Sequence, residues 1–267
     1  MKWLLILLII AVSPSVAAWG PSGHRIVCHI AWHSLSDPLQ QQTASAAKRM
    51  GFQNFADSCV WADHIRFYPQ FDSLKVLHYV NVPKSADSVD RRRDCHNTEK
   101  PGCVLTAITD YRQRWKNPAL SQQQRDQALL LLSHFIGDVH QPMHVAYQFD
   151  RGGNRRIVTW MNNKSLSLHR LWDTAIIGCN NKNSWQKIAH QLLSDISPQQ
   201  RQQWGTIAIN QENTIDQWAN ESLALTRKIY RELEQSWQPA DYCQRFTPVA
   251  QQRLQMAGIR LAALIND

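Results

Sequence analysis

Histidine and aspartate recur at helical spacing in the middle of the chain. His134 and Asp138 lie four residues apart in the segment HFIGDVHQPMH, and His169 and Asp173 repeat this spacing in LHRLWD. Residues i and i+4 share one face of an α-helix, so each pair places an imidazole beside a carboxylate. Nitrogen and oxygen ligands in a closed cage suit a metal cation, for which zinc is the usual occupant.

The remaining histidines differ in how well they fit such a site. His144 follows Pro142, which ends the preceding helix, so its ring can face a different metal ion from that of His134. His140 lies two residues after Asp138 and points to another helix face, so we expect it to be structural. The histidines that we interpret as ordinary core or surface residues are His29, His33, His64, His96 and His190.

The first eighteen residues are typical of a secretory signal peptide. Lys2 supplies the positive charge, Leu4–Val12 the apolar segment, and Val16–Ala18 the small residues of a cleavage site. The apolar segment is too short for a membrane-spanning helix. We therefore expect cleavage after Ala18, a mature chain that begins at Trp19, and a soluble protein that is secreted or periplasmic.

Length and cysteine content predict one exported domain over residues 19–267. An even number of cysteines in an oxidising compartment indicates three disulfides, formed by Cys28, Cys59, Cys95, Cys103, Cys179 and Cys243. The absence of CxxC spacing argues against a zinc–thiolate site, which leaves histidine and aspartate as ligands. The net charge of +8 suits a polyanion, either nucleic acid or an anionic lipid surface, although it also fits simple solubility.

Hydrophobic periodicity predicts a mainly α fold, a single compact helical domain with a short β-hairpin. Val76–Val82 alternates as a short strand, and Arg155–Met161 follows a Gly-Gly turn as one arm of the hairpin. The polar stretch 84–103 is expected to be a surface loop that its own two cysteines can close. The expected helices are 22–36, 38–49, 56–67, 103–116, 121–140, 166–176, 183–195, 198–236 with an interruption, and 246–265.

A series of short motifs gives the chain a family resemblance. WGPSGH, WAD, LHYVN, HFIGDVHQPMH, GGN and LHRLWD follow one another in the order found in the zinc-dependent single-strand-specific nucleases, the S-one/P-one nuclease family. The chain is also similar to bacterial zinc phospholipase C, which shares the helical fold. The resemblance covers most of residues 19–267 and implies a trinuclear cluster of three Zn²⁺ ions in a cleft.

The resemblance also implies a full set of metal ligands. The α-amine and carbonyl oxygen of Trp19 would bind one zinc, so signal cleavage would create part of the site. Asp138 would bridge two ions, which lie about 3.5–4 Å apart in two-metal hydrolases. The third ion would keep open positions for substrate. The implied ligands are Trp19, His24, Asp63, His78, His134, Asp138, His144, His169 and Asp173.

By the same resemblance, Arg66 joins Asp63 and Asp138 as a catalytic residue. It would steady negative charge on the phosphoryl oxygens, whereas without the resemblance a solvated helix arginine is an equal interpretation. Cys28 would pair with Cys59, Cys95 with Cys103, and Cys179 with Cys243.

Four further residues match substrate-contacting positions of the family. Tyr79 would stack on a nucleobase, although a strand residue of this kind can also belong to the core. Asn81 stands where relatives can carry an aspartate that orients the arginine at position 66. The amide keeps an acceptor but loses the charge, which weakens this orienting role. Asn154 in GGN would lie near the cleft. Thr174 replaces an asparagine of some relatives, which would alter a second nucleotide pocket.

These features favour a secreted zinc-dependent phosphodiesterase that hydrolyses single-stranded DNA and RNA to 5′-phosphorylated products and also acts as a 3′-nucleotidase. Phospholipase C activity on phospholipid is the alternative. The spacing of Trp19 and His24 and an aspartate, rather than a glutamate, at position 173 favour the nuclease. A non-enzymatic zinc protein would leave the open coordination positions unexplained. We expect a monomer without an obligate protein partner.

Overall fold

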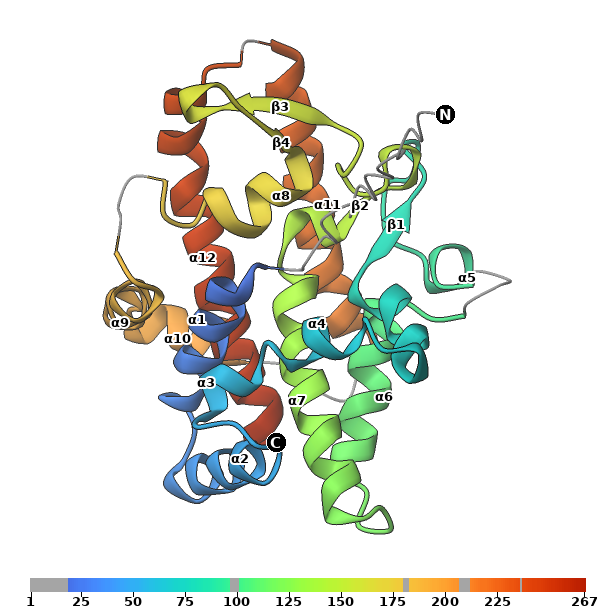
Figure 1. Cartoon of the computed structure of the whole chain (residues 1–267), viewed down its shortest axis with the longest axis vertical. Coiled ribbons are helices and arrows are strands. Elements are labelled where there is room, and N and C mark those ends of the chain that lie inside the picture. Colours follow the sequence, from blue (N-terminus) through green and yellow to red (C-terminus); the bar gives the residue numbers. More distant parts are fainter. Residues whose placement is uncertain (1–18, 97–100, 180–182, 207–211, 236) are drawn as a thin grey trace, which may run out of the picture.

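Helices dominate the computed structural model, which describes residues 19–96, 101–179, 183–206, 212–235 and 237–267 (Figure 1). This agrees with the mainly α class expected from the periodicity. The helices are α1 Pro21–Trp32, α2 Asp37–Arg49, α3 Phe55–Ser58, α4 Trp61–Ile65, α5 Arg91–Asp94, α6 Val104–Lys116, α7 Gln122–Val139, α8 Leu168–Arg170, α9 Trp185–Asp195, α10 Pro198–Gly205, α11 Glu212–Gln235 and α12 Pro239–Asn266. Tighter or wider turns are η1 Pro69–His78, η2 Pro142–His144, η3 Gln148–Asp150, η4 Met161–Asn163 and the π-helical η5 Leu171–Ala175.

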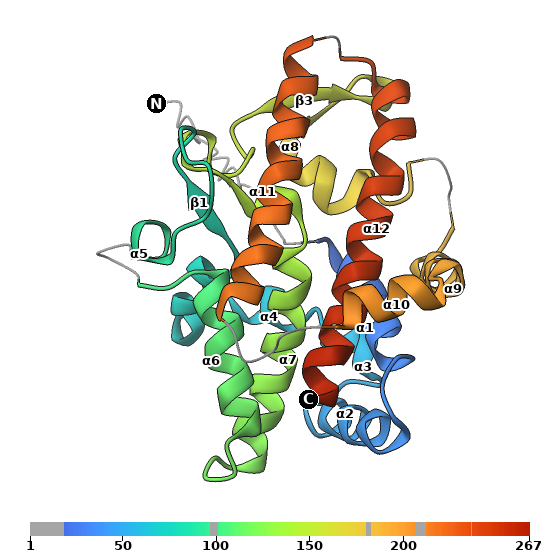
Figure 2. The ribbon, with the colours of Figure 1, turned by 180° about the vertical axis from the view of Figure 1, so that it is seen from behind.

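Helix α7 is the centre of the molecule. It starts at a capping box, in which the Ser121 hydroxyl accepts from the backbone N–H of Gln124, and every residue from Ala128 to Val139 is buried. A helix that is buried on all sides needs neighbours all round, and α7 packs against α6, α12, α2, α4 and α1. Both views show α6 on one side of α7 and α1 on the other (Figures 1 and 2). This central position places His134 and Asp138 deep in the protein.

Two small sheets hold the connections around α7. Strand β1 (Val80–Val82) runs parallel to β2 (Val145–Tyr147), with Val80 opposite Val145, and this pairing brings the chain near His78 beside His144. The expected hairpin is formed by β3 (Ile157–Trp160) and β4 (Lys164–Ser167), which are antiparallel. Its turn has left-handed backbone at two asparagines, a residue type that tolerates positive φ.

Three disulfides join the chain, in the same pairing that the family resemblance implies: Cys28–Cys59, Cys95–Cys103 and Cys179–Cys243. The first ties α1 to the turn between α3 and α4. The second joins the end of α5 to the start of α6 and so closes the last part of the polar loop 84–103. The third links the segment after η5 to α12. In the described chain, no helix is both long and apolar enough to cross a bilayer.

Several expected boundaries are wrong for local reasons. The helix expected over 56–67 is two helices, because the chain turns at Cys59, which is tied to α1. Residues 76–78 end the 3₁₀ turn η1 instead of starting a strand. The helix expected from residue 166 starts at Leu168, because residues 166–167 complete β4. The last helix begins at Pro239, a favourable first position, rather than at residue 246. Tyr242 and Phe246 are buried on this helix, and their packing stabilises its first turns although Pro248 lies inside it.

Candidate metal centre

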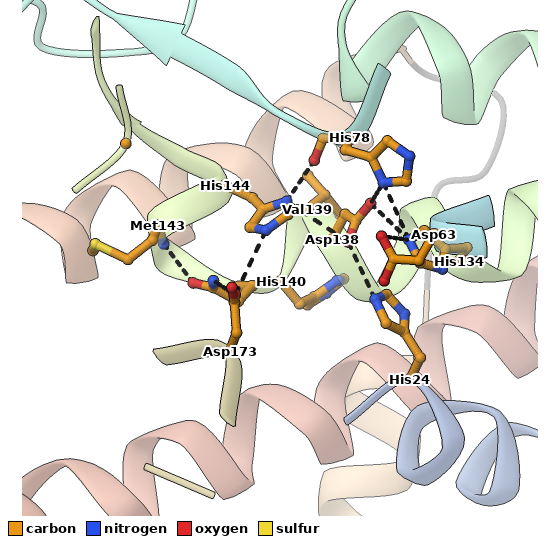
Figure 3. Close-up of polar contacts among 12 residues, drawn as sticks. His24, Asp63, His78, His134, Asp138, Val139, His140, Met143, His144 and Asp173 are labelled. Atoms are coloured by element: carbon orange, nitrogen blue, oxygen red, sulfur yellow. Dashed lines mark hydrogen bonds and ion pairs between the residues drawn. The ribbon is translucent and has the colours of Figure 1, made fainter. Parts of the chain in front are cut away.

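Three buried groups of histidine and aspartate meet at the centre of the fold (Figure 3). Within each group the ligand atoms lie within 4.8 Å of one another. The residues come from α1, α4, η1, α7, η2, α8 and η5, so the site depends on the whole fold. The groups are His24–His134–Asp138, Asp63–His78–His134 and His144–His169–Asp173.

Backbone carbonyls set the tautomers of three of these histidines. Nδ1 of His134 lies 2.7 Å from the oxygen of Cys59, and Nδ1 of His144 lies 2.6 Å from the oxygen of His78. Nδ1 of His169 is 2.7 Å from the oxygen of Gly152. A carbonyl oxygen can only accept, so each Nδ1 carries the proton and each Nε2 presents a lone pair. This arrangement is typical of metal-binding histidines.

The Nε2 lone pairs point at one another. Nε2 of His144 and Nε2 of His169 are 3.1 Å apart, although both are acceptors in the neutral rings. Two nitrogens bound to one tetrahedral zinc at about 2.0–2.1 Å would be about 3.3 Å apart. Nε2 of His134 and Nδ1 of His78 show a similar separation of 3.2 Å. The two acceptors of His144 and His169 repel without a cation, and both separations fit a cation between the two nitrogens.

Unpartnered polar atoms support the same fit. Among the described residues, both carboxylate oxygens of Asp63, Oδ1 of Asp138 and both ring nitrogens of His24 are buried without a hydrogen bond. A buried acceptor without a partner costs about 1–3 kcal/mol. Several such atoms at one place indicate that a ligand completes the site, and their chemistry is that of zinc ligands.

Asp138 stands between two sets of histidines (Figure 3). Its Oδ2 lies 3.0 Å from Nδ1 of His78 and 3.4 Å from Nε2 of His134. Its Oδ1 lies 3.4 Å from Nε2 of His24 and 3.6 Å from Nδ1 of His144. One carboxylate therefore offers an oxygen to each of two neighbouring ligand groups.

Burial keeps the histidines neutral. It is the largest cause that lowers the pKa of His24, His78 and His144 well below the ordinary value, and repulsion among the rings adds to it. Burial, followed by the nearby Asp63, raises the pKa of Asp138 well above the usual range. Neutral imidazoles need not lose a proton to bind a metal, and a bound cation would hold Asp138 in its anionic form.

Trp19 begins the described chain, and its ring and that of His24 both lie near Gly137 of α7. The side chain of Trp19 is fully buried, and the N–H of the next residue, Gly20, donates to the oxygen of Asp173 over 2.7 Å. This bond holds the beginning of α1 against η5, which carries Asp173.

Gln141 is a positioning residue that the sequence analysis missed. It is fully buried, and its Nε2 donates to Oδ1 of Asp173 over 2.6 Å, while its Oε1 accepts from the N–H of Met143. The amide thus orients one carboxylate ligand and the turn that leads to His144. Its place inside HFIGDVHQPMH, between the helix and the proline, is the only sign of this role in the sequence.

His140 has the structural role expected for it. The ring is buried, its Nδ1 donates to the oxygen of Ile136 over 2.7 Å, and its Nε2 accepts from Arg260 over 2.9 Å. Arg253 donates to its carbonyl oxygen, and both arginines bind Glu221. This network fixes the end of α7 against α11 and α12.

The residues expected to act in catalysis or to contact substrate lie either at the metal centre or at a neighbouring pocket. Arg66 is buried, and its Nη1 lies 3.3 Å from Oδ1 of Asp63. Asn154 lies beside the metal centre, with its side-chain nitrogen 3.2 Å from Nδ1 of His169. Tyr79 and Asn81 line a pocket next to it, together with Arg93, Asp94, His96 and Gln148.

Thr174 lies elsewhere. Its hydroxyl donates to the oxygen of Arg170, its side chain is exposed, and it contacts the start of α1 near Gly20 rather than the pocket of Tyr79. This position is separate from the pocket of Tyr79, and a contact of Thr174 with a second nucleotide pocket stays a prediction.

The fold and the centre define a class of helical proteins with a buried histidine–aspartate metal site. The chain belongs to the S1/P1 nuclease family, whose sequence pattern it matches over residues 19–267. It is 32% identical over 269 residues to Endonuclease 5 of Arabidopsis thaliana, covering 93% of this chain and 89% of that protein. It is 32% identical over 186 residues to Nuclease P1 of Penicillium citrinum, covering 66% of this chain and 67% of that protein. Membership of this family supports a nuclease that uses a metal cofactor.

Proposed function

We propose that this protein is a zinc-dependent phosphodiesterase that hydrolyses single-stranded DNA and RNA to 5′-phosphorylated products and removes phosphate from 3′-nucleotides. The observation that carries the proposal is the position of Asp138, whose two oxygens face different histidine groups. Such a carboxylate suits a pair of metal ions, and paired ions are a common solution for phosphodiester hydrolysis.

Three zinc ions would share the ligands of the centre. Asp63, His78, His134 and Asp138 would hold the first, and Asp138 would share the second with His24 and the terminal amine and carbonyl of Trp19. The third would be held by His144, His169 and Asp173. Zinc, when bound, supplies Lewis acidity and lowers the pKa of a coordinated water toward about 7.

The protein's own groups would bind and orient the phosphodiester. Arg66 has its guanidinium beside Asp63, at the edge of the ligand group, and can donate to phosphoryl oxygens. Burial strengthens this interaction, because a guanidinium shielded from water acts through a lower local dielectric. Asp63 would both ligate and hold this arginine in place.

Single-strand preference would come from Tyr79. Tyr79 is 36% exposed at the pocket that Asn81 also lines, so an unpaired base can stack on its ring. Bases in a duplex are stacked on one another and cannot reach such a platform. Asn81 can hydrogen-bond a base edge, and Asn154, beside His169, lies close enough to the centre to contact the reacting nucleotide.

Export would complete the site. Residues 1–18 lie outside the described chain, and we propose that they are a signal peptide whose removal frees the amine of Trp19. Three disulfides suit an oxidising destination, secreted or periplasmic. We propose a monomer that needs no protein partner.

A comparison of hydrolysis rates tests this function. Single-stranded DNA, RNA, duplex DNA and phosphatidylcholine would each be offered to the purified protein, with and without a chelator. We expect rapid, chelator-sensitive hydrolysis of the single strands and much slower hydrolysis of the duplex. Equal rates with chelator present would contradict zinc dependence, and faster hydrolysis of phosphatidylcholine would favour the phospholipase.

A further inference from the structure

A second cluster of histidines lies on the surface, away from the metal centre. The ring centroid of His29 is 4.4 Å from that of His33 and 4.6 Å from that of His190. The ring centroids of His33 and His190 are 6.3 Å apart. From the sequence, all three are expected to be ordinary core or surface residues. In the chain, α1 and α9 are more than 150 residues apart. The two helices pack against each other (Figures 1 and 2). This packing brings the three rings together.

The pair on α1 has a chelating geometry. The N–H of His33 donates to the oxygen of His29 over 3.2 Å, so the helical path reaches His33 and the two side chains lie one turn apart on the same face. Two histidines at i and i+4 on a helix form a familiar zinc-binding pair. His190 approaches this pair from α9 and supplies a third imidazole.

The state of His29 favours ligation. Its Nε2 is buried and has no hydrogen-bond partner among the described residues. Burial, and then repulsion from His33 and His190, lowers the pKa of His29 to about 4, so its ring is neutral at pH 7. His33 follows the last turn of α1, where the partial negative charge of the helix terminus favours a cation.

The cluster is separate from the metal centre, although α1 contributes to both. His24 precedes His29 by five residues, which is about 140° around a helix of 3.6 residues per turn. The imidazole nitrogens of the surface cluster are not gathered as tightly as the ligand groups of the centre. His33 and His190 are exposed, so their rings can rotate toward a shared ion without displacing core residues.

We propose that His29, His33 and His190 form a second metal site, for Zn²⁺ or a similar transition-metal cation, that joins α9 to the C-terminal end of α1. Three imidazoles leave one tetrahedral position for water. The ion would stabilise the contact between α9 and α1, and this role does not depend on the reaction at the buried centre.

Zinc titration of the intact, metal-loaded protein tests the proposal. After gel filtration removes loosely bound metal, calorimetry with Zn²⁺ alone should show one further equivalent that binds in the micromolar range. His33→Asn and His190→Asn should each weaken this binding by at least about 10-fold, since even the loss of a group that only orients a ligand costs about 10–100-fold. Added Zn²⁺ should raise the Tm of the wild type but not of these variants.

His64→Asn is the matched control, because His64 is also exposed but lies on α4 outside the cluster. It should keep the further equivalent and the zinc-dependent rise in Tm. Because positions 33 and 190 are exposed, both variants should match the wild-type Tm before zinc is added, which separates loss of the site from loss of the fold. The proposal is overturned if the wild type takes up no further zinc, or if His64→Asn weakens uptake as much as His190→Asn.

Discussion

Gly137 on α7 lies directly against the ring of His24 on α1. A Cβ atom at position 137 would be 2.8 Å from Nδ1 of His24 and 3.1 Å from Cε1 of the same ring. The ring cannot move easily in the other direction, because it stacks on His134 with the centroids 3.7 Å apart. The missing side chain of Gly137 is therefore what lets His24 reach Asp138.

Gly137→Ala should displace His24 and impair the metal centre. We expect the free energy of unfolding to fall by about 1–3 kcal/mol, the usual cost of adding atoms to a packed core, despite the better helix propensity of alanine. Metal content, measured by elemental analysis, should fall with it. Gly205→Ala is the control, since a Cβ there meets only Ile259, at 3.7 Å. Unchanged metal content in Gly137→Ala would show that His24 does not depend on this close approach.

Asp138→Ala should remove more than one equivalent of metal and abolish hydrolysis. The reason is that its two oxygens face separate histidine groups, so one substitution opens both. Asp173→Ala serves for comparison, because Asp173 belongs to a single group with His144 and His169. Asp173→Ala should therefore lose about one equivalent of metal. Elemental analysis of both variants decides the matter, and equal losses would speak against a bridging carboxylate.

A form of the protein that retains residues before Trp19 should lose much of its activity. A blocked amine cannot ligate, while the other ligands stay in place. The two forms would be separated by mass and compared in nuclease rate and metal content. Equal rates would mean that the amine of Trp19 is not needed.

The sequence predicts the part of the site that lies within single helices. His134 and Asp138 are one turn apart on α7, so local periodicity alone places them together. The sequence does not predict the local structure at His78, because this residue ends the 3₁₀ turn η1 instead of beginning the strand that the alternation indicates. What positions its segment is the parallel pairing of β1 with β2, a contact between residues more than 60 apart.

Contacts between distant segments account for what the sequence did not predict. Gln141 orients Asp173 from 32 residues away, and apart from its place between the helix and the proline nothing in the sequence marks it. His29 and His190 meet only because α9 packs on α1. Local spacing carries no information about such contacts. The buried ligands could be named from the sequence because the family motifs contain all of them.

Tyr79→Ala should raise KM for single-stranded DNA and reduce the preference for single strands. Loss of one base–aromatic stack corresponds to roughly 1–3 kcal/mol. Tyr79→Phe keeps the ring and should stay close to the wild type. Steady-state rates on single-stranded and duplex DNA measure both effects. If Tyr79→Phe is as impaired as Tyr79→Ala, the hydroxyl rather than stacking is what matters.

Glu221 should make stability depend on pH. Burial alone would raise the pKa of this carboxyl, but hydrogen bonds and charges of Arg260 and Arg253 outweigh it, and the pKa is lowered overall. A carboxyl whose pKa is lower in the folded state stabilises the protein above its unfolded pKa of about 4.3. This stabilisation disappears as the pH falls through the folded-state pKa.

Glu221→Gln should therefore lower the free energy of unfolding by about 1.5–3 kcal/mol at pH 7, the range for hydrogen bonds to charged groups. The difference from the wild type should shrink as the pH falls below the unfolded pKa of about 4.3 and through the lowered folded-state pKa of Glu221. Denaturant unfolding of both proteins across this pH range measures the difference in the free energy of unfolding. Glu234→Gln, at an exposed position on the same helix, should change stability by less than about 0.5 kcal/mol at any pH. A difference for Glu221→Gln that is constant from pH 7 to pH 3 would mean that its charge does not hold Arg253 and Arg260 in place.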